Sequence, residues 1–260
     1  MGVLISLISL YLLIGLLLYI FQRKIIFIPD PLPKDHKFKF KNLNKELFIT
    51  TTSGNTINTL FFTPNITSKG LVFYHHGNSH NLNLWGLEAK TFTDRGYSVL
   101  MYDYPKYGKS VGSLSLKKIL TDAHFLLNIY AKDQPKIINY GRSLGTGIAL
   151  KISASNPDLI SLTILETPYF SLKKMAKTFI NIYPLNFILI ERLKSYRTIA
   201  KVKHPIEIFH GTNDELIPYK QASQLAKKSK LANLTTIEEG THNDLPLTIK
   251  YQKRIDLLLR

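Results

Sequence analysis

Short apolar runs alternate with longer amphipathic stretches along most of the chain, and this rhythm restricts the possible fold more than any other feature. The runs are apolar on both faces, as are strands buried in a parallel sheet. Strands are expected at residues 71–74, 98–102, 136–140, 159–165, 205–209 and 234–238. Helices are expected at residues 84–94, 116–131, 144–155, 219–229 and 244–258. The alternation predicts an α/β protein with a mostly parallel, doubly wound central sheet and helices on both faces.

The part of the chain before residue 63 has a different pattern. Short strands are expected at residues 25–29, 46–52 and 55–62. The turn formed by Ser53 and Gly54 joins the last two, which indicates an antiparallel opening to the sheet.

A second departure lies late in the chain, at residues 168–198, where many apolar side chains surround Pro184. We expect this stretch to form a short helical cap inserted into a single domain that covers residues 23–260. The alternative is an ordinary crossover helix, which would turn the same apolar side chains toward the sheet.

The first residues form a long apolar segment, because residues 2–21 contain no charged side chain. As a helix they rise about 30 Å, the thickness of the hydrocarbon core of a bilayer. No basic segment precedes them and no small-residue cleavage site follows, which argues against a cleaved signal peptide. We expect a transmembrane anchor at residues 1–22. Arg23 and Lys24 follow it directly, so the positive-inside rule predicts a cytoplasmic domain.

The chain is strongly basic and has no cysteine. It carries 34 Lys and Arg against 18 Asp and Glu, a formal net charge of +16. The basic residues are scattered and no nucleic-acid motif is present, so anionic lipid head groups are the expected partner and nucleic acid is not. The lack of cysteine excludes disulfides, thiolate nucleophiles and zinc sites that need sulfur. No cofactor is expected.

The segment Gly141-Arg142-Ser143-Leu144-Gly145 lies between an expected strand and an expected helix. This context is typical of a nucleophile elbow, in which a serine on a sharp strand-to-helix turn is held in a strained conformation with its hydroxyl free. Ser143 is therefore the candidate nucleophile. The segment lacks the Gly-Lys-Ser/Thr ending of a phosphate-binding loop.

A serine hydroxyl needs a base, usually an imidazole that a carboxylate holds in place. In proteins with such an elbow, the acid and then the histidine follow the serine along the chain. His242, in a loop between the last strand and the last helix, is the candidate base, whereas His204 and His210 lie at strand ends and are expected to be structural. Asp214, just after a strand, is the leading candidate acid.

Three other acidic residues that follow Ser143 are alternatives for the same role. Glu166, at the end of the strand before the cap, is the serious rival of Asp214. Glu215 is interpreted as an exposed charge. Asp244 is interpreted as a first-turn charge of the final helix, where it interacts favourably with the helix dipole.

An oxyanion hole requires two backbone N–H groups, one from the residue after the nucleophile and one from the loop after an earlier strand. Leu144 supplies the first, and Asn78, after the flexible Gly77, is expected to supply the second. Three histidines lie nearby, at positions 75, 76 and 80, but no acidic ligand accompanies them. We therefore expect no metal site.

These segments resemble the α/β-hydrolase superfamily, and within it the single-pass, membrane-anchored hydrolases related to serine aminopeptidases and prolyl oligopeptidases. The resembling segments are residues 76–78, 103–110, 141–145, 166–168, 210–214 and 240–244. The resemblance implies the same triad of Ser143, Asp214 and His242, with Asn78 and Leu144 as oxyanion donors. The family usually has glycine where this chain has Lys106, and we expect that side chain to narrow or charge the mouth of the site.

The expected function is that of a membrane-bound serine hydrolase that cleaves an ester, thioester or amide through an acyl-enzyme. The apolar cap and the anchor favour lipid-like acyl substrates. Two alternatives stay open: an aminopeptidase or short-peptide hydrolase on the same fold, and a catalytically silent, membrane-tethered binding protein.

Overall fold

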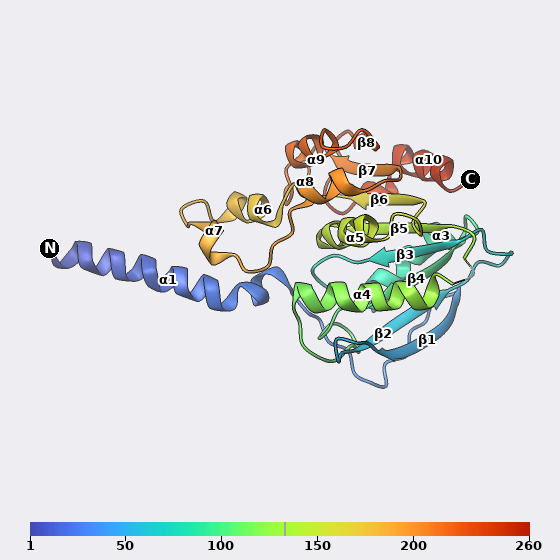
Figure 1. Cartoon of the computed structure of the whole chain (residues 1–260), viewed down its shortest axis with the longest axis horizontal. Helices are drawn as coiled ribbons and strands as arrows, with labels where there is room; N and C mark the ends of the chain where they lie inside the picture. The colour runs from blue at the N-terminus through green and yellow to red at the C-terminus, as the bar shows by residue number, and fades with distance from the viewer. Residues whose placement is uncertain (133) are drawn as a thin grey trace.

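The computed structural model describes residues 1–132 and 134–260, and within them eight strands form one sheet in the order β1-β2-β4-β3-β5-β6-β7-β8 (Figure 1). The strands are β1 (Leu43–Thr50), β2 (Thr56–Phe62), β3 (Leu71–His75), β4 (Ser98–Tyr102), β5 (Ile137–Arg142), β6 (Leu162–Glu166), β7 (Ile206–Gly211) and β8 (Ala232–Ile237). β2 pairs with β1 and β4 in antiparallel fashion, and the pairs from β4 to β8 are parallel. The predicted mostly parallel sheet with an antiparallel opening is confirmed.

Helices cover both faces of this sheet. The α-helices of the described residues are α1 (Gly2–Ile26), α2 (Leu82–Trp85), α3 (Ala89–Thr93), α4 (Leu116–Tyr130), α5 (Leu144–Ser155), α6 (Leu172–Phe179), α7 (Leu185–Ile188), α8 (Ser195–Thr198), α9 (Tyr219–Ala226) and α10 (Ile249–Leu258). Three short 3₁₀ helices accompany them: η1 (Gly86–Glu88), η2 (Ile199–Lys201) and η3 (Leu245–Leu247).

Alternate residues of the strands supply separate hydrophobic clusters on the two faces of the sheet, because successive side chains point to opposite faces. Phe73 packs in one core with apolar residues of α4 and α5. Its neighbours Val72 and Tyr74 pack in the other, with α2, α3 and α10. Strands that are buried on both faces therefore read as continuous apolar runs.

Three expected elements differ from the structure. Residues 25–29 are not a strand, because α1 continues past the polar residues 22–24 to Ile26 and ends where Phe27 takes an extended conformation. The helix expected at 84–94 is divided into α2, η1 and α3. The helix expected at 244–258 begins only at Ile249, after η3, with the Thr248 side chain as its N-cap.

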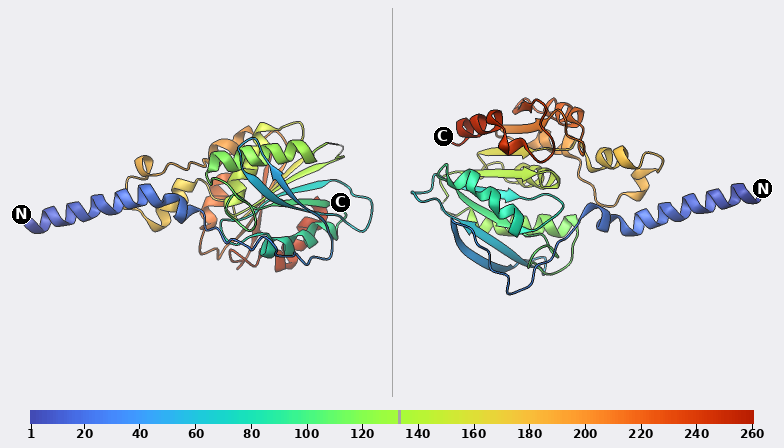
Figure 2. Two further views of the ribbon diagram at one scale, coloured as in Figure 1. Left: turned by 90° about the horizontal axis from the view of Figure 1, so that it is seen from below. Right: turned by 180° about the vertical axis from the view of Figure 1, so that it is seen from behind.

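Among the described residues, α1 is the one helix long and apolar enough to cross a membrane, judged by length and composition. Its N-terminal half projects away from the body of the molecule (Figure 2). Its side chains are almost all exposed, and Gln22 is its one buried residue.

Residues 168–198 contain α6, α7 and α8. Helices α6 and α7 lie beyond the edge of the sheet, beside the C-terminal half of α1, in the views of Figures 1 and 2. Helix α8 instead packs against α5. We call residues 172–190 the cap from here on.

Candidate active site

Ser143 connects β5 to α5 and has the backbone angles φ 49° and ψ −116°. A residue other than glycine is strained in this region, and such strain is concentrated at functional sites. The turn is held from both sides, because the Ser143 N–H donates to the Glu166 carbonyl at 2.9 Å and Thr146 Oγ1 donates to the Ser143 carbonyl at 2.6 Å. Gly145 is required here, since a Cβ would lie 2.1 Å from the His75 carbonyl oxygen.

His242 and Asp214 come from neighbouring loops that follow β8 and β7. His242 Nδ1 lies 2.8 Å from Asp214 Oδ2, and both side chains are largely buried. The other carboxylate oxygen, Oδ1, accepts from the backbone N–H groups of Leu216 and Ile217 at 3.0 and 2.8 Å. Because an ionised carboxylate only accepts, His242 donates from Nδ1 and its Nε2 is free to take a proton.

The ionisation of Asp214 results from two opposed effects. Burial raises the pKa of the carboxyl, but hydrogen bonds from His210, His242 and the backbone N–H of Ile217 outweigh it. They hold the pKa of Asp214 well below its ordinary value. Asp214 therefore carries a negative charge beside the imidazole over the whole neutral range.

His210 contacts the candidate acid, a role that the sequence did not indicate. Its Nε2 lies 2.8 Å from the Ile217 carbonyl oxygen and 3.2 Å from Asp214 Oδ2. A carbonyl oxygen can only accept, so this nitrogen carries the proton and also faces the carboxylate. His210 thus contacts the same carboxylate oxygen as His242 and helps to fix the rotamer of Asp214. The sequence feature that could have indicated this contact is the i, i+4 spacing of His210 and Asp214 across the end of a strand.

Glu166 does not lie with His242. It is fully buried and accepts from the hydroxyls of Tyr140 and of Tyr251, the latter at 3.0 Å. Its Oε1 lies 3.2 Å from Arg142 Nη1. The structure therefore brings Asp214, rather than Glu166, to the imidazole.

The other two acidic residues differ from each other. Glu215 is exposed, in line with its interpretation as a surface charge. Asp244 was interpreted wrongly, since α10 begins five residues later. Its Oδ1 accepts from the Thr241 N–H at 2.7 Å and closes the turn that carries His242.

Arg142, the residue before the serine, also holds this turn, and the sequence interpretation missed it. It is buried against the ring of Trp85, at 5.3 Å from the centroid. Its Nη2 donates to the His242 carbonyl at 3.1 Å and to Asn243 Oδ1 at 3.0 Å. An arginine in a buried strand must have an ionic partner. The position of Arg142 at the end of an apolar run could therefore have indicated that it is paired. Glu166 is that partner.

Asn78 and Leu144, the expected oxyanion donors, line the same pocket as Ser143. The Asn78 carbonyl is held by the Tyr107 hydroxyl at 2.6 Å and by the Ile28 N–H at 2.9 Å. Neither the Asn78 nor the Leu144 backbone N–H donates to any residue of 1–132 or 134–260. Both groups are therefore available to a substrate oxygen.

The histidines near Asn78 have separate surroundings. His75 is buried between the Tyr102 hydroxyl and Asn139 Oδ1, at 2.7 and 2.8 Å, and burial lowers its pKa to about 3. Burial lowers the pKa of His76 to about 3 as well, and this ring stacks on Tyr104. His80 is exposed. Among the described residues no three His, Cys, Asp or Glu side chains are grouped to hold a metal ion.

Two cavities meet at Ser143 and Asn78. The first, of about 340 Å³, is the more polar of the two. His242, Arg142 and Glu88 line it, together with the apolar side chains Leu84, Trp85, Leu87 and Leu216. The second, of about 220 Å³, is lined apart from Ser143 and Asn78 by apolar residues alone, which are Ile25, Ile26, Leu144, Leu172, Met175, Ala176, Phe179, Ile180 and Leu189. We call them the polar cavity and the apolar pocket.

Lys106 does not line either cavity, contrary to expectation. Its backbone has a φ of 73°, in the left-handed region that favours glycine, and its side chain is exposed. The glycine that the family usually has here therefore serves the turn, and the lysine does not narrow the site.

Known proteins resemble this chain in sequence and in fold. The family described as Serine aminopeptidase, S33, matches residues 66–196. The α/β hydrolase domain-containing protein WAV2 of Arabidopsis thaliana is 27% identical, over 88% of this chain and 83% of its own. Protein bem46 of Schizosaccharomyces pombe is 31% identical, over 68% of this chain and 62% of its own.

Two solved structures are similar in fold. An esterase of Pyrococcus furiosus has a TM-score of 0.69 at 16% identity, with 89% of this chain and 95% of its own covered. The ferulic-acid complex of Est1E from Butyrivibrio proteoclasticus has a TM-score of 0.67 at 21% identity, with 82% and 97% covered.

The eight-stranded sheet and the serine elbow at the end of β5 define a hydrolase of the α/β class. The chain belongs to the α/β-hydrolase superfamily, in the family of serine aminopeptidases, S33.

Proposed function

We propose that this chain is a membrane-anchored serine hydrolase that cleaves carboxylic ester or thioester bonds of acyl substrates. The observation that carries the proposal is the 2.8 Å hydrogen bond from His242 Nδ1 to Asp214 Oδ2, in a cavity that His242 shares with the strained Ser143. This arrangement supports a serine nucleophile with an oriented base.

In the proposed reaction, Ser143 Oγ attacks the substrate carbonyl carbon while its proton passes to His242 Nε2. The carbonyl electron pair moves to the oxygen, which accepts from the N–H groups of Asn78 and Leu144. When the oxyanion collapses, the oxygen or sulfur of the leaving group departs with the proton from Nε2. Water then attacks the acyl carbonyl carbon and gives a proton to Nε2. The second oxyanion collapses, the bond from the acyl carbon to Ser143 Oγ breaks, and Nε2 returns its proton to Oγ, which releases the acid and restores Ser143.

In this proposal, the two cavities bind the two parts of the substrate on either side of the scissile bond. Because the leaving group must receive its proton from His242, it belongs in the polar cavity that His242 lines. The acyl group then takes the apolar pocket beside Leu144. This division supports acyl substrates with a polar leaving group.

The aminopeptidase alternative deserves a test because the matching family carries that description. An aminopeptidase holds the α-ammonium of its substrate on the acyl side of the bond, where a carboxylate is needed. In the part of the chain that the structure describes, no charged side chain lines the apolar pocket, and an unpaired ammonium there would be costly. We expect p-nitrophenyl octanoate and S-octanoyl thiols to be hydrolysed with kcat/KM at least about 10²-fold above that for leucine p-nitroanilide. Faster cleavage of the anilide would support the aminopeptidase.

The anchor is tested by extraction of the full chain. An apolar helix of the length of α1 stays in a bilayer irreversibly, whereas binding by charge alone is screened by salt. We expect the protein to remain with membranes through 1 M salt, about seven times physiological ionic strength, and through alkaline carbonate. Arg23 and Lys24 at the end of α1 predict a cytoplasmic domain, which protease added to intact cells leaves uncut. Release by salt, or digestion from outside, would contradict the respective parts of this prediction.

A further inference from the structure

We propose that the anchoring helix α1 forms one wall of the acyl site, and that the apolar pocket between α1 and α6 takes the chain of a single-chain lipid ester directly from the bilayer. This inference rests on the proposed function and names its substrate class and its route of entry. Ile25 and Ile26 of α1 line the pocket from one side, and Met175, Ala176 and Phe179 of α6 line it from the other.

The α1 wall is fixed to the catalytic domain by buried polar contacts. Gln22 Nε2 donates to the Ile188 carbonyl at 2.9 Å, and its Oε1 accepts from the Ile190 N–H at 2.6 Å. Arg23 Nε lies 2.6 Å from the buried carboxylate of Glu191, whose other oxygen accepts from the Leu116 N–H at 3.2 Å. The last turns of α1 are therefore part of the folded domain and not a flexible tether.

The cap follows α1 deep into its apolar part. The rings of Tyr11 and Tyr183 are stacked at 4.6 Å, and the Tyr11 hydroxyl donates to the Ile182 carbonyl at 3.0 Å. Tyr11 precedes Arg23 by twelve residues, or about 18 Å of helix. Half of a hydrocarbon core is about 15 Å. If α1 spans the bilayer, the tip of the cap lies within the hydrocarbon.

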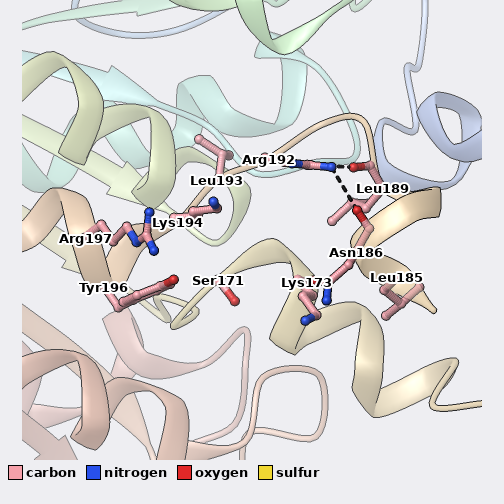
Figure 3. A pocket seen from close by; sticks show the side chains of 10 residues that line it. All are labelled: Ser171, Lys173, Leu185, Asn186, Leu189, Arg192, Leu193, Lys194, Tyr196 and Arg197. Carbon is pink, nitrogen blue, oxygen red and sulfur yellow. Dashed lines mark hydrogen bonds between the residues drawn. The ribbon is translucent and has the colours of Figure 1, made fainter. Parts of the chain in front are cut away.

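The side chains of the cap suit that position. Phe179, Ile182 and Phe187 are 62%, 70% and 82% exposed, so large apolar side chains stand on the outer surface of the tip, next to the exposed polar residues Lys177, Asn181 and Asn186. Figure 3 shows a separate pocket beside the cap, which is lined by the basic residues Lys173, Arg192, Lys194 and Arg197 together with Leu185 and Asn186. Exposed apolar side chains beside a basic cluster suit the boundary between the acyl chains and the anionic head groups of a leaflet.

The size of the apolar pocket limits the substrate to one chain. A volume of about 220 Å³ holds about seven methylene groups, if each takes up about as much space as a water molecule, 30 Å³. The second chain of a diacyl lipid would have to enter the polar cavity, where Leu84, Trp85 and Leu87 offer some apolar surface but the polar groups of His242, Arg142 and Glu88 also line the space. Placing a hydrocarbon chain against charged groups is unfavourable. A single-chain ester leaves that cavity to its polar alcohol.

The test uses the full chain in phospholipid vesicles and p-nitrophenyl esters from acetate to palmitate. Each buried methylene contributes about fourfold to kcat/KM, so the rate should rise with length to about eight carbons and then level off. Ala176→Trp fills the pocket from α6, and Ile25→Trp fills it from α1. Each should lower the octanoate-to-acetate ratio of kcat/KM about 100-fold. Thr178→Trp, on the exposed side of α6, is the matched control and should leave the ratio unchanged.

The outcomes separate the inference from the proposed function. If the unmodified chain hydrolyses no ester and does not react with a fluorophosphonate, the proposed function fails. If it is active but the ratio falls in Ala176→Trp alone, α1 is not a wall of the site. If Thr178→Trp lowers the ratio as much as Ala176→Trp does, or if diacyl phospholipid is hydrolysed as fast as its single-chain counterpart, the assignment of the pocket is wrong.

Entry from the bilayer is measured separately with single introduced cysteines, which can be labelled specifically because the chain has no cysteine of its own. Phe187→Cys, labelled with an environment-sensitive fluorophore, should show a blue shift in vesicles and quenching by spin-labelled lipid acyl chains. Asn65→Cys, exposed in the loop before β3, is the control and should show neither. Equal responses at the two positions would overturn insertion of the cap.

Discussion

Ser143→Ala is expected to abolish covalent labelling by a fluorophosphonate and to lower kcat for a p-nitrophenyl ester by about 10⁴ to 10⁶. Alanine removes the Oγ that forms the acyl-enzyme, and no cysteine is present to replace it. The backbone N–H groups of Asn78 and Leu144 remain, so residual catalysis over water is expected from oxyanion stabilisation alone. Labelling is followed on denaturing gels, and kcat is measured by release of p-nitrophenol.

Ser155→Ala is the matched control for this experiment. Ser155 is on the same helix, α5, but at its exposed C-terminal end, where its hydroxyl donates only to the Lys151 carbonyl. Labelling and kcat should stay at the level of the unmodified chain. Equal labelling of Ser143→Ala and Ser155→Ala would move the nucleophile to another residue.

Asp214→Asn should lower kcat by roughly 10⁴, because an amide in place of the carboxylate favours the wrong imidazole tautomer. Asp214 accepts two backbone N–H groups through Oδ1, so the loop keeps a partner for them when the side chain becomes an amide. The expected loss is therefore in kcat, with the fold intact by circular dichroism.

Glu166→Gln provides the contrast, since Glu166 was the rival acid. Its partners are Arg142, Tyr140 and Tyr251, and none of them is the imidazole. Removing its charge leaves Arg142 buried without an ionic partner, a change that costs about 3–5 kcal/mol of stability. We expect a lower Tm and less than about a tenfold change in kcat. A larger loss of kcat in Glu166→Gln than in Asp214→Asn would overturn the assignment of the acid.

The amino-acid sequence by itself determined the layers of the fold and the chain order of the candidate site. Strands that are buried on both faces must be apolar throughout, so β3 to β7 were visible as short runs without any tertiary information. Ser143 was visible because a glycine-flanked serine between a strand and a helix is a local pattern. Parallel strands end at one edge of a sheet, which is why residues after β5, β7 and β8 could be expected to meet.

Local reasoning failed where a segment had two physically acceptable conformations. Residues 25–29 are apolar and suit a strand or a helix equally well. The choice followed from α1, which continues through Ile26 because each further residue adds a hydrogen bond within the helix. Asp244 likewise is compatible with the start of a helix or with a loop. In the structure its side chain accepts a hydrogen bond from the Thr241 N–H, which stabilises the loop.

Only the tertiary structure decided which charged groups became partners and what surrounds Ser143. Arg142 pairs with Glu166 from the next strand and holds the turn of His242 a hundred residues later in the chain, while His210 supports Asp214. The apolar pocket joins the end of α1 to α6, segments about 150 residues apart. Such contacts depend on packing at atomic distances between segments remote in sequence, and no periodicity or motif encodes them locally.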